Sequence, residues 1–240
     1  MDSGFYAACA GLRTQTEALD LVAHNLANTN TTGYRRQQPT FRSLLTGHSA
    51  NPLNLVLNHF SVMGGTQLDL TPGNLRATGN PLDVAIEGAG FFAVQTSHGT
   101  LYTRDGNFRV SAKGQLVTAQ GDPVLGEQGP IPVPTGLASI SADGTLSIAG
   151  AVAGKLRVLD FAGSALTPVG SSYYDAGQAK GLPAAAASVR QGMLEASNVD
   201  PLAAVVNLIS VQRSAEMLQR ALSMFHSDFN HIAASEVPRV

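Results

Sequence analysis

Two helical stripes of apolar residues, one near each end of this 240-residue chain, constrain its fold more than any other feature. Near the N-terminus, Phe5, Leu12, Leu19 and Leu26 recur every seven residues, and Val22 fills an intermediate step. Near the C-terminus the apolar residues alternate three and four positions apart, which is the spacing of a coiled-coil seam. That seam consists of Leu208, Val211, Ala215, Leu218, Leu222, Phe225, Phe229 and Ile232. Long helices at both ends suggest a subunit that polymerises through its termini.

The ends of these helices can be read from local signals. The first helix is predicted from about Ser3 to Asn28, where a polar cluster closed by Gly33 stops it. The last helix is predicted to open after Asp200, a good N-cap, with Pro201 at the first helical position.

Between the helices the sequence has the pattern of antiparallel β-structure. Short β-prone runs are separated by glycine-containing turns, which predicts successive hairpins. One turn is Asp105-Gly106, where we expect Gly106 to adopt positive φ. The predicted strands are 82–86, 91–96, 100–104, 108–111, 115–118, 131–133, 139–141, 145–148 and 155–161, followed by a loop-rich return over 163–187.

Together these elements predict an α+β fold. Its centre is a mainly antiparallel β domain, and its long N- and C-terminal helices pair as a coiled coil. The expected organisation is a discontinuous terminal-helix assembly domain formed by 1–36 with 191–240, and a β-rich domain over 81–190. Prolines and glycines without periodicity predict an extended connector over 37–80.

Composition excludes several classes of function. A net charge of −2 offers no basic footprint for nucleic acid. The only cysteine, Cys9, excludes an intramolecular disulfide or a multi-cysteine zinc site, and its place on the apolar stripe predicts a small buried side chain. No apolar run approaches the roughly 20 residues of a membrane span. The N-terminus lacks the pattern of a cleaved signal peptide, so if the protein leaves the cytoplasm, we expect it to do so without one.

The sequence carries no motif that indicates catalysis. Residues 88–93 have the letters of a dinucleotide fingerprint, but Phe91 and Phe92 continue as a strand where the fingerprint needs a helix, so we expect a tight turn. The six histidines are scattered without metal-ligand spacing. We therefore expect no enzyme activity, no cofactor, no metal and no small-molecule substrate.

Four segments, in order along the chain, resemble a known family. His24-Asn25-Leu26-Ala27-Asn28, followed by Thr32-Gly33-Tyr34-Arg35-Arg36, resembles the N-terminal signature of the flagellar rod, hook and hook-associated axial proteins. Residues 82–92 and 102–108 are similar to the opening of that family's β domain, and 195–200 to its C-terminal helix entry. The motif residues are Asn25, Leu26, Ala27, Asn28, Gly33, Ser197, Asn198 and Val199.

The resemblance implies a structural subunit of the flagellar basal-body rod in the periplasm, needed for motility. Such a subunit is exported by the flagellar type III apparatus and joins copies of itself and other rod proteins through its terminal helices. Within the family the chain looks most like a proximal-rod subunit, and a distal-rod or hook-type axial subunit is the alternative. Phe41 with Leu45 fits the Phe-x-x-x-apolar pattern of export-gate recognition, although a strand or turn anchor explains it equally well.

Two readings from other classes stay open at this point. One is a secreted β-domain binding module whose helices pack as a hairpin on its own sheet. The other is an enzyme whose site no motif reveals, which a wet pocket with convergent titratable groups would favour.

Overall fold

The computed structural model describes residues 2–43, 61–162, 165–170, 172–184 and 186–236. The chain divides into two compact units. Unit 1 comprises Met1–Leu26, Gln38–Thr66 and Pro201–Val240, and unit 2 comprises Ala27–Gln37 and Gln67–Asp200.

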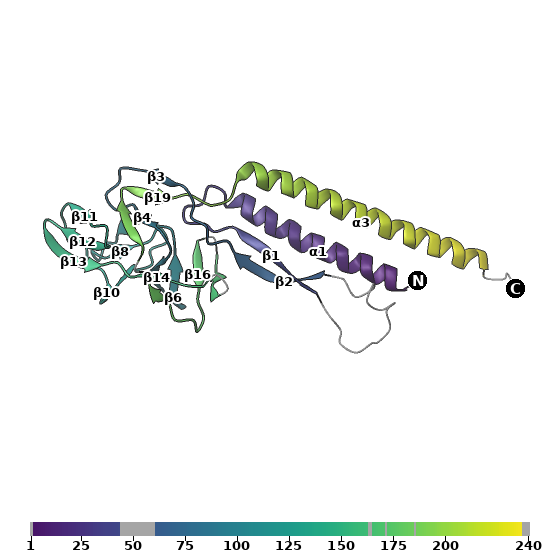
Figure 1. Ribbon diagram of the computed structural model, residues 1–240, viewed down its shortest axis with the longest axis horizontal. Helices are drawn as coiled ribbons and strands as arrows, with labels where there is room; N and C mark the ends of the chain where they lie inside the picture. The colour runs from purple at the N-terminus through teal and green to yellow at the C-terminus, as the bar shows by residue number, and fades with distance from the viewer. Residues whose placement is uncertain (1, 44–60, 163–164, 171, 185, 237–240) are drawn as a thin grey trace. The chain divides into compact units, whose positions relative to one another are not determined.

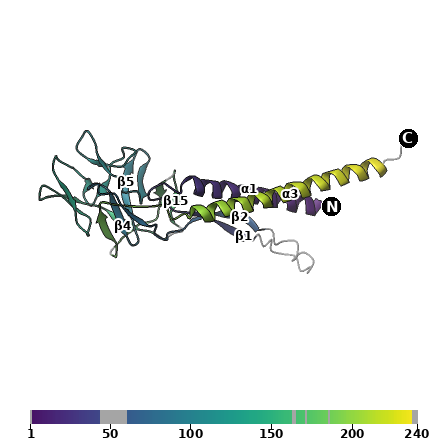
Figure 2. The same cartoon turned by 90° about the horizontal axis from the view of Figure 1, so that it is seen from above.

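Unit 1 contains the two long helices and one pair of strands (Figures 1 and 2). Helix α1 spans Asp2–Ala27 and helix α3 spans Pro201–Glu236, so α3 begins at the proline that the sequence predicts. Strand β1 (Gln37–Ser43) pairs with β2 (Ser61–Leu68) within the segment expected to be an extended connector. No helix in the described part of the chain is long and apolar enough to cross a membrane.

Unit 2 holds the remaining strands, and all its strand pairs are antiparallel (Figure 1). A six-stranded sheet has the order β15-β16-β6-β5-β14-β17, a three-stranded sheet has the order β11-β12-β13, and β18-β4, β19-β3, β7-β8 and β10-β9 form pairs. The bounds are β3 (Leu75–Ala77), β4 (Val84–Glu87), β5 (Phe91–Thr96), β6 (Gly99–Thr103), β7 (Arg109–Val110), β8 (Leu116–Val117), β9 (Leu125–Gly126), β10 (Gly129–Pro130), β11 (Ala138–Ile140), β12 (Thr145–Ile148), β13 (Ala151–Lys155), β14 (Val158–Asp160), β15 (Thr167–Pro168), β16 (Tyr173–Asp175), β17 (Leu182–Pro183), β18 (Ser188–Gln191) and β19 (Met193–Glu195). The predicted α+β class with a mainly antiparallel β body is confirmed.

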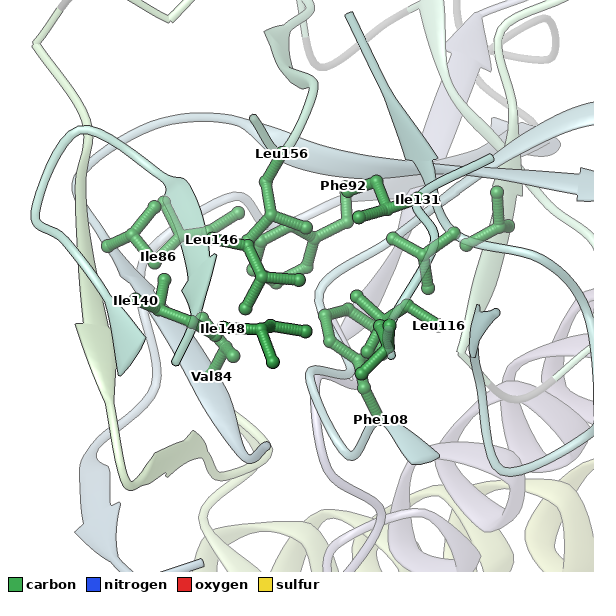
Figure 3. Close-up of a cluster of buried hydrophobic side chains, with 14 of the residues drawn as sticks. Val84, Ile86, Phe92, Phe108, Leu116, Ile131, Ile140, Leu146, Ile148 and Leu156 are labelled. Atoms are coloured by element: carbon green, nitrogen blue, oxygen red, sulfur yellow. The ribbon is translucent and has the colours of Figure 1, made fainter. Parts of the chain in front are cut away.

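The main core of unit 2 lies among strands from several of these sheets (Figure 3). Val84, Phe92, Leu116 and Leu146 are fully buried there, and Phe92 meets Phe108 edge to face with ring centroids 5.2 Å apart. A second buried cluster forms around Phe91 and Tyr174, among other residues. At about 1.5–3 kcal/mol for each large apolar side chain, this burial supplies the main stabilisation of the unit.

Both outer strands of the six-stranded sheet are short and contain a proline. Pro168 lies in β15 and Pro183 in β17. Because proline has no backbone N–H to donate, these edges are poor templates for pairing with another chain.

Several sequence expectations about local structure hold. Strands β5 and β12 have the predicted bounds. Residues 88–90, which begin the segment with dinucleotide-fingerprint letters, form the turn between β4 and β5, with φ of 105° at Gly88 and 130° at Gly90. Gly33, expected after the first helix, has φ of 69°.

Other expectations are wrong. No strand spans 131–133, because Pro132 cannot donate to a ladder, and this segment forms only an isolated antiparallel bridge between Pro132 and Gln115. The predicted loop-rich return contains three strands, β15, β16 and β17. The sequence did not predict them because the one β-prone pair, Tyr173 and Tyr174, lies among small residues.

The predicted hairpin turn at Asp105-Gly106 is also wrong. β6 pairs with β5 and β16, whereas the strand after the turn, β7, pairs with β8. Gly106 is not among the glycines with positive φ. A glycine is needed there for a different reason, because a Cβ at this position would overlap the carbonyl oxygen of Val84.

We therefore predict that Gly106→Ala costs about 3 kcal/mol, at the upper end for overpacking, because the obstructing atom is backbone. Gly121→Ala is the control: Gly121 has φ of 94° but nothing within 4 Å of an added Cβ, so only about 1 kcal/mol of backbone strain is expected. Urea unfolding of both variants measures the difference. Equal losses would show that close approach to Val84 does not matter.

Candidate assembly interface

The N-terminal stripe in α1 is only partly covered in unit 1. Val22 is buried, together with its neighbour Leu21, whereas Leu12, Leu19 and Leu26 are half-buried. Cys9 is a free thiol and is half-buried rather than fully buried as predicted. The side chain of Phe5 lies outside those that the structure describes.

The C-terminal seam in α3 is less covered still. Leu208, Val211, Ala215, Leu218 and Leu222 are all half-buried. Among the described side chains of α3, which are those of 201–224 and 227, none is fully buried. The remaining predicted seam residues, whose side chains are not among those described, are Phe225, Phe229 and Ile232.

Helices α1 and α3 approach each other within unit 1 at Gly11 and Leu218. A Cβ built on Gly11 of α1 would lie 3.6 Å from Cδ1 of Leu218 in α3, which is an ordinary van der Waals distance. Leu218 therefore lies next to the α1 backbone, at a position without a side chain.

Helix α3 carries a second apolar stripe that the sequence analysis missed. Its members are Leu202, Val206, Ile209, Met217 and Met224, which are between 46 and 75% exposed. At about 100° of rotation per residue, these positions lie on the face opposite the seam through Leu218. The pattern is visible in the sequence, but Arg213 and Arg220 interrupt it, so the seam alone was recognised.

In unit 2, the segment that follows α1 is hydrogen-bonded to the segment that precedes α3. We call residues 28–36 and 195–200 together the motif junction. The Gly33 N–H donates to the Glu195 carbonyl over 2.8 Å, and the Asn198 N–H donates to the Tyr34 carbonyl over 3.4 Å. An added Cβ at Gly33 would overlap the Asp105 backbone nitrogen, so glycine is required there by close approach as well as by φ.

A buried ionic triad lies in the motif junction and its surroundings. The Glu195 carboxylate accepts from Arg35 Nη2 over 2.7 Å and from Arg104 Nη1 over 3.1 Å, and at most 3% of any of the three side chains is exposed. The Gly73 N–H also donates to Glu195 Oε1, over 2.8 Å. One carboxylate thus joins segments from four distant parts of unit 2.

The triad carries one more positive charge than negative, and Arg104 has further partners that offset the excess. Its guanidinium donates to the carbonyls of Ile86 and Gly88 and lies over the Phe91 ring, 5.2 Å from the centroid. Burial lowers the pKa of Arg104 to about 10, and the charge of Glu195 partly offsets that effect. Arg104 thus remains charged at neutral pH.

The amide of Asn198 connects three backbone segments. Its Oδ1 accepts from the Arg36 N–H over 2.6 Å, and its Nδ2 donates to the carbonyls of Asp69 and Thr71 over 2.9 and 3.0 Å. The Arg36 guanidinium also pairs with the Asp69 carboxylate at 2.7 Å. Burial alone would raise the pKa of Asp69, but hydrogen bonds from Thr71 and Arg36 outweigh burial and lower it.

A further link attaches the segment after α1 to the β-strand region. Thr32 Oγ1 donates to Asp105 Oδ1 over 2.8 Å. Burial nevertheless raises the pKa of Asp105, and the nearby charge of Asp83 adds to that rise.

Tyr174 closes the motif junction from the six-stranded sheet. Its hydroxyl accepts from the Arg35 N–H over 2.9 Å and donates to the Gly33 carbonyl over 3.4 Å. Burial raises the pKa of Tyr174 to about 12, and burial also raises the pKa values of Tyr34 and Tyr173.

These shifts predict a loss of stability in alkali. Because the folded pKa of Tyr174 lies above the ordinary value of about 10, its contribution is complete below pH 10 and is lost as pH rises through about 12. Tyr174→Phe should reduce the slope of unfolding free energy against pH by up to about 1.4 kcal/mol per pH unit in that window. Urea unfolding from pH 9 to 12 measures both slopes, and identical slopes would contradict the assignment.

The structure brings some of the sequence-predicted motif residues together and not others. Gly33 and Asn198 lie in the motif junction, where Asn28 and Val199 are buried and Ser197 is half-buried. Asn25, which is buried, and Leu26 belong to α1 in unit 1, while Ala27 is exposed. In the predicted export signal, Phe41 falls in β1, and Leu45 lies outside the described residues. Sequence reasoning did not identify the triad, although Arg35, Arg104 and Glu195 all lie in the segments that carry the family resemblance.

A surface cavity of about 500 Å³ lies beside β13, β14 and β17 in unit 2. Its charged lining consists of Glu127, Asp143, Lys155 and Arg157, and Lys155 pairs with Glu127 at 3.6 Å while both are largely exposed. Within the described residues, no three His, Cys, Asp or Glu side chains are grouped so as to hold a metal ion. The cavity therefore offers a solvated surface ion pair rather than a set of buried titratable groups.

Comparison with known proteins gives matches along most of the chain. Three family models match: flagella basal body rod protein over residues 5–35, flagellar hook protein FlgE/F/G D1 domain over 85–148, and flagellar basal body rod FlgEFG protein C-terminal over 190–230. The flagellar basal-body rod protein FlgF of Escherichia coli K12 is 35% identical over 240 residues, covering 93% of this chain and 94% of the relative. The chain belongs to the flagellar basal-body rod protein family.

Rod proteins of both subtypes are similar to this chain. FlgF of Caulobacter vibrioides is 32% identical, covering 92% of this chain and 93% of the relative. FlgG of Agrobacterium fabrum is 33% identical, covering 90% and 92%. Members of the rod family are structural proteins rather than enzymes, so the site to be explained is an interface and not a catalytic centre.

Proposed function

We propose that this chain is a structural subunit of the bacterial flagellar basal-body rod, of the proximal F type. The observation that carries the proposal is its similarity to rod proteins over nine-tenths of both sequences. Its partners would be other rod proteins, copies of itself and the flagellar type III export apparatus, and its location the periplasmic part of the basal body. Co-purification with basal bodies tests this role.

Within this role, we propose that α1 and α3 pair as a coiled coil through the two predicted stripes. The proximity of Leu218 to Gly11 and the three-four alternation of the α3 seam support the pairing. The proposed assembly domain is formed by residues 1–36 with 191–240, joined through 37–80 to the β-rich domain over 81–190. These bounds overlap unit 2 at 27–36 and 191–200.

The opposite faces of α3 suggest how subunits join. A helix that lays its seam against α1 leaves the stripe through Ile209 and Met217 exposed, because one partner cannot cover both sides. Burying such side chains gains about 25 cal/mol for each Å² of apolar surface removed from water. We propose that neighbouring subunits cover this stripe and complete the burial of the seam, since related subunits joined head to tail without closing form a filament.

A distal-rod or hook-type axial role is the alternative within the family, because FlgG relatives match as well as FlgF relatives do. Expression of this chain in strains that lack either FlgF or FlgG separates the subtypes. Restored swimming in the first strain alone supports the F type, and restoration in the second alone favours the distal subunit. The secreted binding module is the alternative from another class, and the absence of this chain from purified basal bodies would favour it.

We further propose that Phe41 and Leu45 contribute to export. Phe41→Ala combined with Leu45→Ala should leave the subunit folded but lower its periplasmic amount at least tenfold, because an export gate that reads both side chains would lose its contacts. Immunoblots of periplasmic and cytoplasmic fractions measure the distribution, and Thr40→Ala in the same strand is the control. Normal periplasmic levels of the double variant would remove this segment from the export signal.

A further inference from the structure

We propose that the motif junction preorganises the helix pair, by holding the chain after α1 against the chain before α3. The inference rests on the helix pairing proposed above. It goes beyond that pairing by explaining what brings the two helices together. Ala27 and Pro201 are separated by most of the sequence, so the free chain would rarely bring α1 and α3 together.

Direct bonds across the motif junction shorten that separation. The Gly33 N–H bonds to the Glu195 carbonyl, the Arg36 N–H to Asn198 Oδ1, and Arg35 to the Glu195 carboxylate. All these residues belong to unit 2, so the bonds do not depend on the helices themselves. Through them, the path from the end of α1 to the start of α3 is roughly a dozen residues.

Without the motif junction, the path is longer. Complete release includes loss of the Thr32–Asp105 bond and of the bonds of the Tyr174 hydroxyl to Arg35 and Gly33. The chain after α1 would then next be fixed at the buried Leu68 and at β3, which pairs with β19. That loop holds roughly fifty residues, and loop-closure probability falls as about the 3/2 power of loop length. Complete release of the motif junction should thus lower the effective concentration of α1 at α3 about tenfold.

Asn198 is the residue at which this idea can be tested, and the chain provides a matched control. The Asn198 amide has three backbone partners and is half-buried, so its loss is less disruptive than loss of the triad. Gln191 is a half-buried amide in the same unit, and it too has three backbone partners: the Ile140 N–H and the carbonyls of Pro81 and Ala138. Gln191 does not bond to residues 28–36 through any of these contacts.

The effective concentration can be measured as a disulfide equilibrium in the purified subunit. Gly11→Cys and Leu218→Cys are introduced in a Cys9→Ser background, where the space beside Gly11 admits a side chain. The equilibrium constant of this disulfide against glutathione reports how often the two positions meet. Any strain in the disulfide is common to all variants and cancels in their ratio.

We expect Asn198→Ala to lower this constant at least threefold, with tenfold as the bound for complete release, and Gln191→Ala to leave it within twofold. A smaller fall in Asn198→Ala, or an equal fall in Gln191→Ala, overturns the inference. The melting transition of unit 2 is recorded for each variant. If Asn198→Ala does not fold, Asn198→Gln, which displaces the same amide by one methylene, is measured against the same threshold.

The outcome is distinguishable from failure of the rod assignment. In the subunit that keeps Asn198 and Gln191, the disulfide equilibrium constant should be higher in buffer than in concentrated urea. If it is no higher, the helices do not meet in the subunit and the inference is overturned. Membership of the rod would be unaffected by that result, because incorporation into basal bodies tests it separately.

Discussion

Glu195→Leu is expected to destabilise unit 2 by about 3–5 kcal/mol, because it leaves two buried guanidinium groups without their shared carboxylate. Arg35 and Arg104 are almost completely buried, so water cannot replace the lost carboxylate in the folded unit. The Gly73 N–H would lose its partner as well. Urea unfolding followed by the tyrosine signal of unit 2 measures the loss.

The control for this prediction is an ion pair of the same length on the surface. Glu87 accepts from Arg190 Nε over 2.7 Å, as Glu195 does from Arg35, but about half of each of these side chains is exposed. Glu87→Leu should therefore cost less than about 1 kcal/mol. If the two substitutions cost the same, burial of the triad does not determine its contribution, and the account of the motif junction fails.

Met217→Asp is expected to abolish swimming while the isolated subunit keeps its stability within about 0.5 kcal/mol. Met217 is 64% exposed in the subunit, so a carboxylate there remains in water. If a neighbouring subunit covers this stripe in the rod, the same carboxylate loses its hydration at every copy, at a cost of several kcal/mol that Arg213 and Arg220 on the same face offset only in part. Swimming in soft agar and thermal melting of the purified subunit measure the two effects.

Gln219→Asp provides the control for that substitution. Gln219 is an exposed residue of α3 two positions further on, about 200° around the helix from Met217 and outside the second stripe. This variant introduces the same charge and should leave swimming unchanged. Loss of swimming in both variants would indicate that any added charge on α3 is harmful, and the stripe would have no special role.

What the sequence predicts well here depends on local chemistry. The start of α3 follows from an N-cap aspartate and a proline at the first helical position, both of which act within one turn. β5 is equally local, because an apolar β-prone run lies between two glycine turns. The class of fold follows from these elements.

The features that the sequence did not predict depend on contacts between distant segments. At Gly106 the constraint is the Val84 carbonyl, which a local turn rule does not include. The triad joins residues far apart in the chain, and only the folded unit brings them together. The spacing of the second stripe of α3 is visible in the sequence, but Arg213 and Arg220 on the same face are typical of a solvent-exposed surface.

The amount of this chain in purified basal bodies tests the central claim most directly, when the wild type, Met217→Asp and Gln219→Asp each replace the native copy. We expect quantitative immunoblots to find the wild type and Gln219→Asp in equal amounts, and Met217→Asp reduced at least tenfold although it is exported and folded. Incorporation of Met217→Asp at the wild-type level would contradict assembly through this face of α3. Absence of the wild type would contradict the rod assignment itself.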